Sequence, residues 1–393
     1  MKRISIFIDC EFGGNGGSQY IKAILNALIS LSPTSFSVTV IYTSTCWENY
    51  LNTFPDIKTV FFKKNKLLNR FYQVLISFDC HSIAKLLAHF IDQKVEFIET
   101  QNFDFIILPI SDTIGCLLNA KVIGTIHDLM HRYERQFKEA GGLLRYHYRD
   151  NYIKNLLLSS TAILVDSSFG KKQVLDSFDQ IKSKIFTLPY IAPDYIYSKE
   201  LSQQSLSDAI VPGRRYLFYP AIFQPHKNHI NLIKAIKILK ERGHLIDLLL
   251  AGKKQLEYKK LLKFVNENDL GEQVKFLGYL PNTDIIYLYK NAFAMVMPTF
   301  FGPTNIPPVE AIVLNCPPVV SNIYGMPEQL GDAAMYFDPN NPSEIADRIE
   351  SLLTSNDLRN NLLKNGIKSR EKFSQKRFES DLKNILQQLG LSL

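Results

Sequence analysis

The stretch RYLFYPAIFQPHKNHINLIKAIKILK, residues 215–240, predicts a β-strand followed by a loop and an α-helix. Residues 215–219 are rich in aromatic and apolar side chains, which favours a strand. From Asn228 to Lys240, apolar residues recur at the three- and four-residue spacing of a helix. A strand that leads into a helix in this way is the repeating unit of a parallel α/β sheet.

The same alternation continues in both directions from this stretch. Downstream, it predicts strands at 245–251, 274–277, 294–297 and 318–321 and helices at 256–267, 283–291 and 308–314. Upstream, it predicts strands at 4–9, 37–42, 97–99, 105–109, 122–126, 162–166 and 184–188 and helices at 19–30, 145–159 and 169–178. The chain from residue 342 onward is helical by period. Two such runs indicate two facing Rossmann-like domains of the α/β class, with ligands bound in the cleft at the carboxyl ends of the strands.

Length and composition agree with two domains. The chain has 393 residues, of which 46% are hydrophobic and 21% charged, a balance that can fill two cores. The polar segment SKELSQQSLSDAIVPG, residues 198–213, shows no strand pattern and is interpreted as a linker. We therefore expect an N-terminal domain at 1–197, a C-terminal domain at 214–372, and a last helix at 373–393 that packs back on the N-terminal domain.

Charge, cysteine usage and hydropathy exclude several classes of protein. The net charge of +7 is too moderate for a nucleic-acid binder. The five cysteines are scattered singly, which fits free thiols in a reducing compartment and argues against a structural zinc site. No apolar run is long enough to span a bilayer, and the first residues lack the pattern of a signal peptide. The sequence therefore predicts a cytoplasmic protein.

A local cluster of basic and apolar residues allows a contact with a membrane. Lys63, Lys64, Lys66 and Arg70 stand among phenylalanines and leucines. Such a patch either touches an anionic membrane surface or is a solvated face beside an ordinary core. The second interpretation is favoured by about two to one, because such patches are common on soluble proteins.

A glycine-rich loop follows the first predicted strand. The segment FGGNGGSQY, residues 12–20, carries four glycines, of which Gly16 and Gly17 stand directly before the predicted helix. Glycines let the backbone approach a ligand, and the first N–H groups of a helix favour an anion. The spacing does not match the dinucleotide fingerprint, and no acid ends the second strand, which argues against a nicotinamide cofactor. A ligand contact and a plain tight turn both remain open.

His127 and Asp128 follow the predicted strand at 122–126. An imidazole at this position could bind a sugar hydroxyl. Alternatively, it caps the next turn, with Asp128 as a helix N-cap. The stretch HRYERQFKEAGGLLRYHYR, residues 131–149, follows and is rich in basic and aromatic side chains. This stretch either holds an anionic acceptor or is an amphipathic surface helix.

The second domain carries the more specific signals. Lys227 and Asn228 follow a strand and open a helix, where a lysine can pair with a diphosphate together with helix N–H groups. Further on, MPTFFGPTNIPPVEAIV, residues 297–313, predicts a strand–loop–helix junction with Glu310 in the first turn of the helix. A carboxylate there could accept two ribose hydroxyls, with its charge favoured by the helix dipole. The alternative is an ordinary exposed glutamate.

These motifs resemble the retaining glycosyltransferase family 4, whose members have the GT-B fold. The resemblance rests on Lys227-Asn228, on Glu310, and on the segment that contains Gly325, Pro327, Glu328, Gly331 and Asp332. Two positions depart from the family pattern. The first glutamate of the family's paired motif, which seven residues separate from the second, falls on Gly302, and the arginine expected five residues before the lysine is Ile222. The form of the loop is similar to a branch of polysaccharide and lipopolysaccharide transferases that includes mannosyltransferases.

The resemblance implies a role for each of these positions. Lys227 would neutralise the departing diphosphate, Glu310 would bind ribose, and His127 would face the transferred sugar. Gly16 and Gly17 would approach the diphosphate from the N-terminal, acceptor-binding domain. The remaining donor contacts in the C-terminal domain are Asn228, Gly302, the backbone of Thr304, Asn305 and Ile306, and, for the base, Tyr279 and Leu280.

The implied reaction moves a hexose from a nucleotide diphosphate sugar to a saccharide or lipid-linked acceptor with retention at the anomeric carbon, in surface polysaccharide or O-antigen synthesis. GDP-mannose is the donor that the branch suggests. Since no paired-carboxylate metal motif is found, we expect no metal and no other cofactor, and a location at the inner face of the membrane is compatible with the acceptor. A sugar-nucleotide epimerase of similar architecture and a non-catalytic scaffold with a decayed donor site remain as alternatives.

Overall fold

The computed structural model describes residues 2–13, 16–198 and 209–391, and the chain forms two compact units. The first consists of Met1–Tyr190 and Gln375–Leu393, and the second of Ile191–Ser374. Most of the expected linker, residues 199–208, lies outside the described residues. Residues directly after Tyr190 lie with the second unit, because Ala192 and Ile196 are buried in its core.

The first unit is built on a seven-stranded parallel sheet in the order β3-β2-β1-β4-β5-β6-β7. Its inner strands are buried on both faces, as parallel strands covered by helices are. In the register of the first pair, Ile4 lies beside Val38 and Ile6 beside Val40. The strands are β1 (Lys2–Ile8), β2 (Phe36–Tyr42), β3 (Lys58–Phe61), β4 (Phe105–Ile107), β5 (Val122–Thr125), β6 (Ala162–Val165) and β7 (Lys184–Thr187).

One predicted strand of the first unit is a helix in the structure, and several of its helices were not predicted. The strand expected at 97–99 is wrong, because these residues belong to a helix in which Asp92 accepts a hydrogen bond from Lys94 N and Val95 and Ile98 are buried three residues apart. The edge strand β3 and the helices at Glu48–Leu51, Lys66–Ser77, His81–Ile91 and Met130–Tyr133 were not predicted. The helices are α1 (Gly16–Ser35), α2 (Glu48–Leu51), α3 (Lys66–Ser77), α4 (His81–Ile91), α5 (Gln93–Thr100), α6 (Met130–Tyr133), α7 (Leu143–Ser159) and α8 (Ser168–Ser177).

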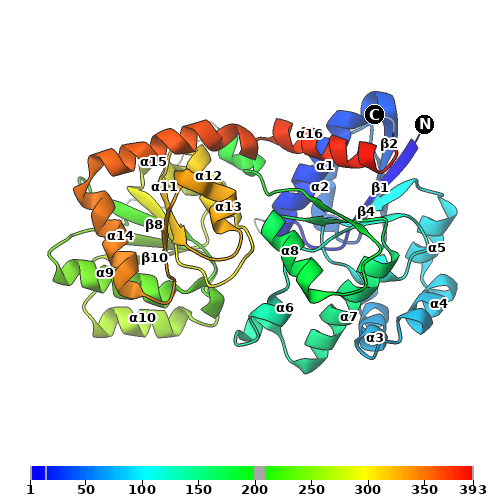
Figure 1. Cartoon of the computed structure of the whole chain (residues 1–393), viewed down its shortest axis with the longest axis horizontal. Helices are drawn as coiled ribbons and strands as arrows, with labels where there is room; N and C mark the ends of the chain where they lie inside the picture. The colour runs from blue at the N-terminus through cyan, green and yellow to red at the C-terminus, as the bar shows by residue number, and fades with distance from the viewer. Residues whose placement is uncertain (1, 14–15, 199–208, 392–393) are drawn as a thin grey trace. The chain divides into compact units, whose positions relative to one another are not determined.

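The last helix, α16 (Gln375–Gln388), lies beside α1 in the first unit (Figure 1). The Gln375 side chain donates to the Ala23 carbonyl over 3.1 Å, and the Phe378 ring meets the Tyr20 ring edge-on. Leu382 and Leu386, one turn apart, are fully buried. This apolar stripe explains why the end of the chain packs on the first unit.

The second unit contains a six-stranded parallel sheet in the order β10-β9-β8-β11-β12-β13. The strands are β8 (Tyr216–Pro220), β9 (Asp247–Ala251), β10 (Val274–Gly278), β11 (Ala294–Met297), β12 (Pro318–Ser321) and β13 (Met335–Phe337). The helices are α9 (His229–Glu241), α10 (Tyr258–Glu267), α11 (Asn282–Asn291), α12 (Ile306–Val313), α13 (Met326–Leu330), α14 (Pro342–Thr354) and α15 (Asn356–Ser369). The two predicted Rossmann-like domains and the helical C-terminal segment are confirmed.

The strand order of each sheet also indicates which loops are candidate ligand-binding positions. In the second unit, β9 and β10 extend from one side of β8, and β11 pairs with its other side. In the first unit, β2 and β3 extend from one side of β1, and β4 pairs with the other. Ligands of such sheets bind at the carboxyl ends of the strands where the order reverses, so the loops after β8 and β11 and after β1 and β4 are the candidate positions.

Candidate functional site

The loops after β8 and β11 are tied together at the strand-order reversal of the second unit. The His226 carbonyl accepts hydrogen bonds from Phe300 N over 2.8 Å and from Thr299 Oγ1 over 3.1 Å. The Asn228 side-chain amide donates to the Pro298 carbonyl over 2.8 Å. The loop that carries Lys227 and the loop that leads to Glu310 therefore form one connected surface, as their positions after neighbouring strands predict.

Lys227 supplies a cation that the unit does not neutralise. It is the last residue of a short 3₁₀ turn, Pro225–Lys227, before α9, and its carbonyl accepts from Tyr219 Oη over 3.0 Å. Within the described part of the chain, its ammonium has no hydrogen bond or ion pair. Burial lowers the pKa of Lys227 to about 8 because desolvation penalises the charged form. An anionic ligand would relieve this penalty, which makes the position suited to a phosphate group.

Asn228 holds the same loop in place. It adopts the left-handed conformation with a φ of 56°, which asparagine tolerates better than most residues, and it is 1% exposed. Its amide donates to the carbonyls of Pro298 and Pro339, both over 2.8 Å. The Oδ1 atom is buried without a partner in the described structure. These bonds give Asn228 a structural role, and its predicted contact with the donor remains a prediction.

Glu310 lies deeper than the sequence predicted. The expectation that it stands in the first turn is wrong, because α12 begins at Ile306 and Glu310 is the fifth residue. Its two carboxylate oxygens accept hydrogen bonds from Tyr195 Oη over 2.7 Å and Tyr289 Oη over 2.8 Å. Burial raises the pKa of Glu310, and the two tyrosine hydroxyls oppose this effect because they bind the ionised form.

Two tyrosines thus orient the carboxylate that we predict to bind ribose. Each oxygen has a second lone pair, so the tyrosine contacts leave capacity for ligand hydroxyls. Tyr195 and Tyr289 carry no sequence signal of their own, since one lies 115 residues and the other 21 residues from Glu310. Sequence reasoning missed both of them.

The loop between β11 and α12 explains why a glycine replaces the family's first glutamate. Gly302 has a φ of 123°, a conformation that L side chains rarely adopt. A Cβ atom at this position would lie 2.6 Å from Asn305 Nδ2. A glutamate at residue 302 would therefore be strained by the backbone conformation and would also require the Asn305 side chain to move.

The backbone of Thr304, Asn305 and Ile306 was predicted to contact the sugar and the phosphates. Asn305 N donates to Gln329 Oε1 over 3.0 Å, and the Asn305 carbonyl accepts from Gln329 Nε2 over 2.9 Å. Both backbone groups of Asn305 are thus bonded to Gln329, and its contact with the donor remains a prediction. Ile306 begins α12 and is followed by two prolines, so it carries the only N–H among the first three helical positions. Thr304 is 6% exposed.

Tyr279 and Leu280, the two candidates for the base pocket, have different environments. Leu280 is 8% exposed and is part of the hydrophobic core. Tyr279 is 66% exposed at the end of β10, and the Lys253 ammonium lies 5.5 Å from the centre of its ring. An exposed ring offers a stacking surface for a base, whereas a core leucine offers packing alone. Lys253, which sequence reasoning missed, follows β9 directly after Gly252.

In the first unit, Gly16 and Gly17 are the first two residues of α1, directly after the loop that follows β1. Gly14 and Asn15 lie outside the described residues. Ser18 Oγ donates to the Glu11 carbonyl over 3.2 Å, which closes the loop onto the helix start. The glycines therefore stand at a helix N-terminus as predicted, and their contact with a diphosphate remains a prediction.

An acid pair at the strand-order reversal of the first unit was missed by sequence reasoning. Asp9 follows β1 and forms an ion pair with Lys64 over 2.7 Å, and its carboxylate also accepts from Thr43 Oγ1. Burial and the charge of Asp9 raise the pKa of Asp112, which follows β4. One of two adjacent carboxyl groups keeps its proton under such conditions. The pair can therefore both donate and accept hydrogen bonds.

His127 has no free ring nitrogen. Its Nε2 lies 2.9 Å from the Pro109 carbonyl and its Nδ1 lies 2.7 Å from Tyr190 Oη. Since a carbonyl only accepts, Nε2 carries the proton and Nδ1 accepts from the tyrosine. Burial lowers the pKa of His127, so the ring is neutral near pH 7. Contact with the transferred sugar stays a prediction, and it would have to use a C–H edge or displace one of these bonds.

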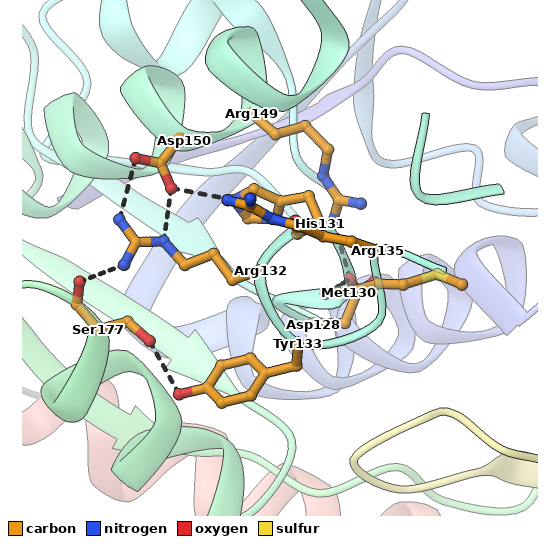
Figure 2. Close-up of polar contacts among 9 residues, drawn as sticks. All are labelled: Asp128, Met130, His131, Arg132, Tyr133, Arg135, Arg149, Asp150 and Ser177. Carbon is orange, nitrogen blue, oxygen red and sulfur yellow. Dashed lines mark hydrogen bonds and ion pairs between the residues drawn. The ribbon is translucent and has the colours of Figure 1, made fainter. Parts of the chain in front are cut away.

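Ion pairs neutralise much of the basic stretch that follows (Figure 2). Arg132 binds both carboxylate oxygens of Asp150, over 2.5 and 2.9 Å, and Arg149 binds Asp128 over 2.9 Å. His131 is buried beside the same Asp150, and burial lowers the pKa of its imidazole.

The other four basic residues of the stretch, Arg135, Lys138, Arg145 and His147, are exposed. The Arg135 guanidinium lies 4.1 Å from the centre of the Tyr146 ring, and Arg145 and His147 lie on α7. Asp128 accepts from Met130 N before α6, which resembles the predicted cap. The exposed cations that could contact an anionic acceptor are therefore Arg135, Lys138 and Arg145 rather than the whole stretch.

Two general features of the described residues bear on the class of protein. They contain no group of three or more His, Cys, Asp or Glu side chains arranged to hold a metal ion. Among them, no helix combines the length and the apolarity that crossing a bilayer requires.

Fold and site define the class: two parallel-sheet Rossmann-like units with loops at the strand-order reversals, the GT-B fold. Solved structures show the same fold. A glycosyltransferase from Rickettsia africae aligns over 100% of both chains with a TM-score of 0.74 and 17% identity. Anabaena Alr3699/HepE, solved in complex with UDP and glucose, aligns over 99% of this chain and 100% of its own with a TM-score of 0.68 and 13% identity.

Sequence comparison identifies the domain in the second unit. Residues 203–369 match the family described as glycosyl transferases group 1, so this part of the chain is a glycosyltransferase domain. The O-antigen chain mannosyltransferase B of Escherichia coli is 28% identical over 233 residues, which are 58% of this chain and 61% of that relative. The chain thus matches less than two thirds of the length of this relative.

Proposed function

We propose that the protein is a retaining hexosyltransferase that moves a sugar, with GDP-mannose as the first donor to test, from a nucleotide diphosphate to a saccharide or lipid-linked acceptor in surface polysaccharide synthesis. The observation that carries the proposal is Lys227, a cation without a partner among the described residues, at the strand-order reversal of a glycosyltransferase domain. The mannosyltransferase relative supports mannose as the sugar.

Chemically, the enzyme must stabilise a leaving diphosphate while the anomeric carbon becomes oxocarbenium-like. Lys227 and the N–H groups at the start of α9 would carry the charge that develops on the phosphate oxygens. Glu310, oriented by Tyr195 and Tyr289, would accept the ribose hydroxyls. In this proposal the acceptor hydroxyl attacks the same face that the diphosphate leaves, its proton passes to a phosphate oxygen, and no metal ion is needed.

In this proposal the first unit binds the acceptor. His127 remains the predicted contact of the transferred sugar, and Gly16 and Gly17 remain predicted contacts of the diphosphate. A lipid-linked acceptor would require contact with a membrane surface at the cytoplasmic face.

The test begins with a thermal-shift screen of GDP-, UDP-, dTDP- and ADP-sugars on the full chain. A stabilising donor is then incubated with and without an oligosaccharide acceptor, and the anomeric configuration of the product is determined by NMR. Transfer with retained configuration supports the proposal. A changed nucleotide sugar formed without acceptor would instead indicate an epimerase, and the absence of binding to every donor would indicate a non-catalytic scaffold.

A further inference from the structure

Exposed apolar side chains are concentrated in one short segment of the first unit, residues 61–91, which contains α3 and α4. Twenty large hydrophobic side chains are exposed among the described residues, and nine of them lie in this segment. They are Phe61, Leu67, Phe71, Val74, Phe78, Ile83, Leu86, Phe90 and Ile91. Such a concentration in less than a tenth of the chain indicates an interaction surface.

Helical spacing arranges these side chains in outward stripes. On α3, Leu67, Phe71 and Val74 follow one another at intervals of four and three residues, which places them on one face. The opposite face is buried in the core of the unit through Tyr72 and Ile76.

The second helix repeats the arrangement and packs beside the first. On α4, Ile83, Leu86 and Phe90 are 52%, 60% and 79% exposed, while Ala84 and Ala88 are buried. Both helices thus have one apolar face on the core and a second apolar face outside.

The same segment is strongly basic. Between Phe61 and Ile91 the sequence contains five lysines and arginines and a single acid, Asp79, which gives the segment a charge of +4, against +7 for the whole chain. Lys64 is paired with Asp9. Lys63, Lys66 and Arg70 are exposed, and the structure gives their side chains no hydrogen bond or ion pair with any described residue.

We propose that the outer faces of α3 and α4 bind the surface of a membrane that contains anionic phospholipids. Apolar side chains of an interfacial helix enter the boundary of headgroups and acyl chains, and basic side chains beside them attract anionic headgroups. Both properties occur here together, on helices anchored by their other face. The charge selects a lipid surface over a second copy of this chain, because two copies of a +4 segment would repel one another.

The surface goes beyond the proposed function, and its test does not depend on transfer activity. The full chain is sedimented with vesicles of phosphatidylcholine alone and with vesicles that contain about one third phosphatidylglycerol. We expect binding to the anionic vesicles only, and a loss of that binding at high salt, since exposed charges are screened.

Two variants separate the contributions. The charge variant K63E/K66E/R70E is expected to lower the partition coefficient about a hundredfold or more, because each basic residue near the surface contributes and each is reversed. The apolar variant L67S/F90S removes the two most exposed side chains of the segment and is expected to lower it at least tenfold.

Matched controls lie elsewhere on the chain. L245S/L256S removes two leucines that are 67% and 68% exposed in the second unit, and K182E/K184E/K259E reverses three exposed lysines. Both controls are expected to bind anionic vesicles within about threefold of the unmodified chain, since the apolar control leaves the basic segment intact and the charge control alters a more dispersed set of charges.

Several results would overturn the proposal: no sedimentation of the unmodified chain with anionic vesicles, equal binding to neutral vesicles, or controls that lose as much binding as the test variants. A dimer in gel filtration that the L67S/F90S variant converts to a monomer would assign the surface to a second copy instead. If the variants do not fold, hydrogen exchange of the unmodified chain with and without vesicles tests the proposal instead. Vesicles should then protect residues 61–91, and protection elsewhere alone would contradict the proposal.

Discussion

Lys227 carries a stability cost that its predicted function explains. Replacing it with methionine keeps the length of the side chain and removes the charge. We expect K227M to be more stable than the unmodified protein in the absence of ligand, to bind nucleoside diphosphate more weakly, and to transfer sugar about a hundredfold more slowly. The last figure corresponds to the loss of one charge-assisted contact with the leaving group, about 3 kcal/mol.

The gain in stability follows from the pKa of Lys227. Burial lowers this pKa from the ordinary 10.5 to about 8, so keeping the ammonium charged in the folded state costs at most about 3 kcal/mol. The side chain is partly exposed, and solvent screening reduces the cost, so we expect K227M to gain about 1 to 2 kcal/mol.

The sign of the pH dependence follows from the same values. The folded pKa lies below the unfolded pKa, so the cost is complete below about pH 8 and shrinks as the pH rises toward 10.5, where both states lose the proton. The stability difference between K227M and the unmodified protein should therefore be largest at pH 7. It should fall between pH 8 and pH 10.5.

Urea denaturation at pH 7 and pH 10 measures this difference, with the exposed Lys259→Met as the control. Calorimetric titration with the nucleoside diphosphate of the best donor measures binding, and a turnover assay measures transfer. A K227M protein less stable than the unmodified protein at pH 7, or one that transfers sugar within a few-fold of it, would refute the reasoning. If the Lys259→Met control gained as much stability as K227M, the gain could not be attributed to burial of the Lys227 ammonium.

Three further outcomes are expected from the site. Glu310→Gln should weaken nucleoside diphosphate binding by about 1.5–3 kcal/mol in a calorimetric titration. In Tyr289→Phe, the loss of nucleoside diphosphate binding at acid pH should begin at a higher pH, because the lost hydroxyl donor raises the pKa of Glu310 further. An unchanged pH dependence of binding would contradict this. His127→Ala should leave nucleoside diphosphate affinity nearly unchanged and lower turnover, and abolished binding would place the donor site in the first unit. Transfer should persist in excess EDTA, and a loss restored by magnesium or manganese would reveal a metal site.

Sequence patterns predicted the two units and most of their strands because the evidence for them is local. The strands at Ala294–Met297 and Pro318–Ser321 begin and end at the predicted residues, since buried parallel strands are short apolar runs, here followed by Pro298 and Asn322. The strand predicted at residues 97–99 was wrong because a brief apolar run fits a strand and a helix equally well. The cap at Asp92 and the buried Val95 belong to the helix, and they lie outside that run.

The sequence by itself determined that Lys227 follows a strand and opens a helix, and that Glu310 belongs to a later strand–loop–helix junction of the same domain. Only the tertiary structure decided what surrounds them. Tyr195 reaches Glu310 across 115 residues of chain, and the Pro109 carbonyl and Tyr190 occupy both nitrogens of His127. Hydrogen-bond partners, burial and the pKa values that depend on them come from residues far apart in the chain, and no local spacing encodes those contacts.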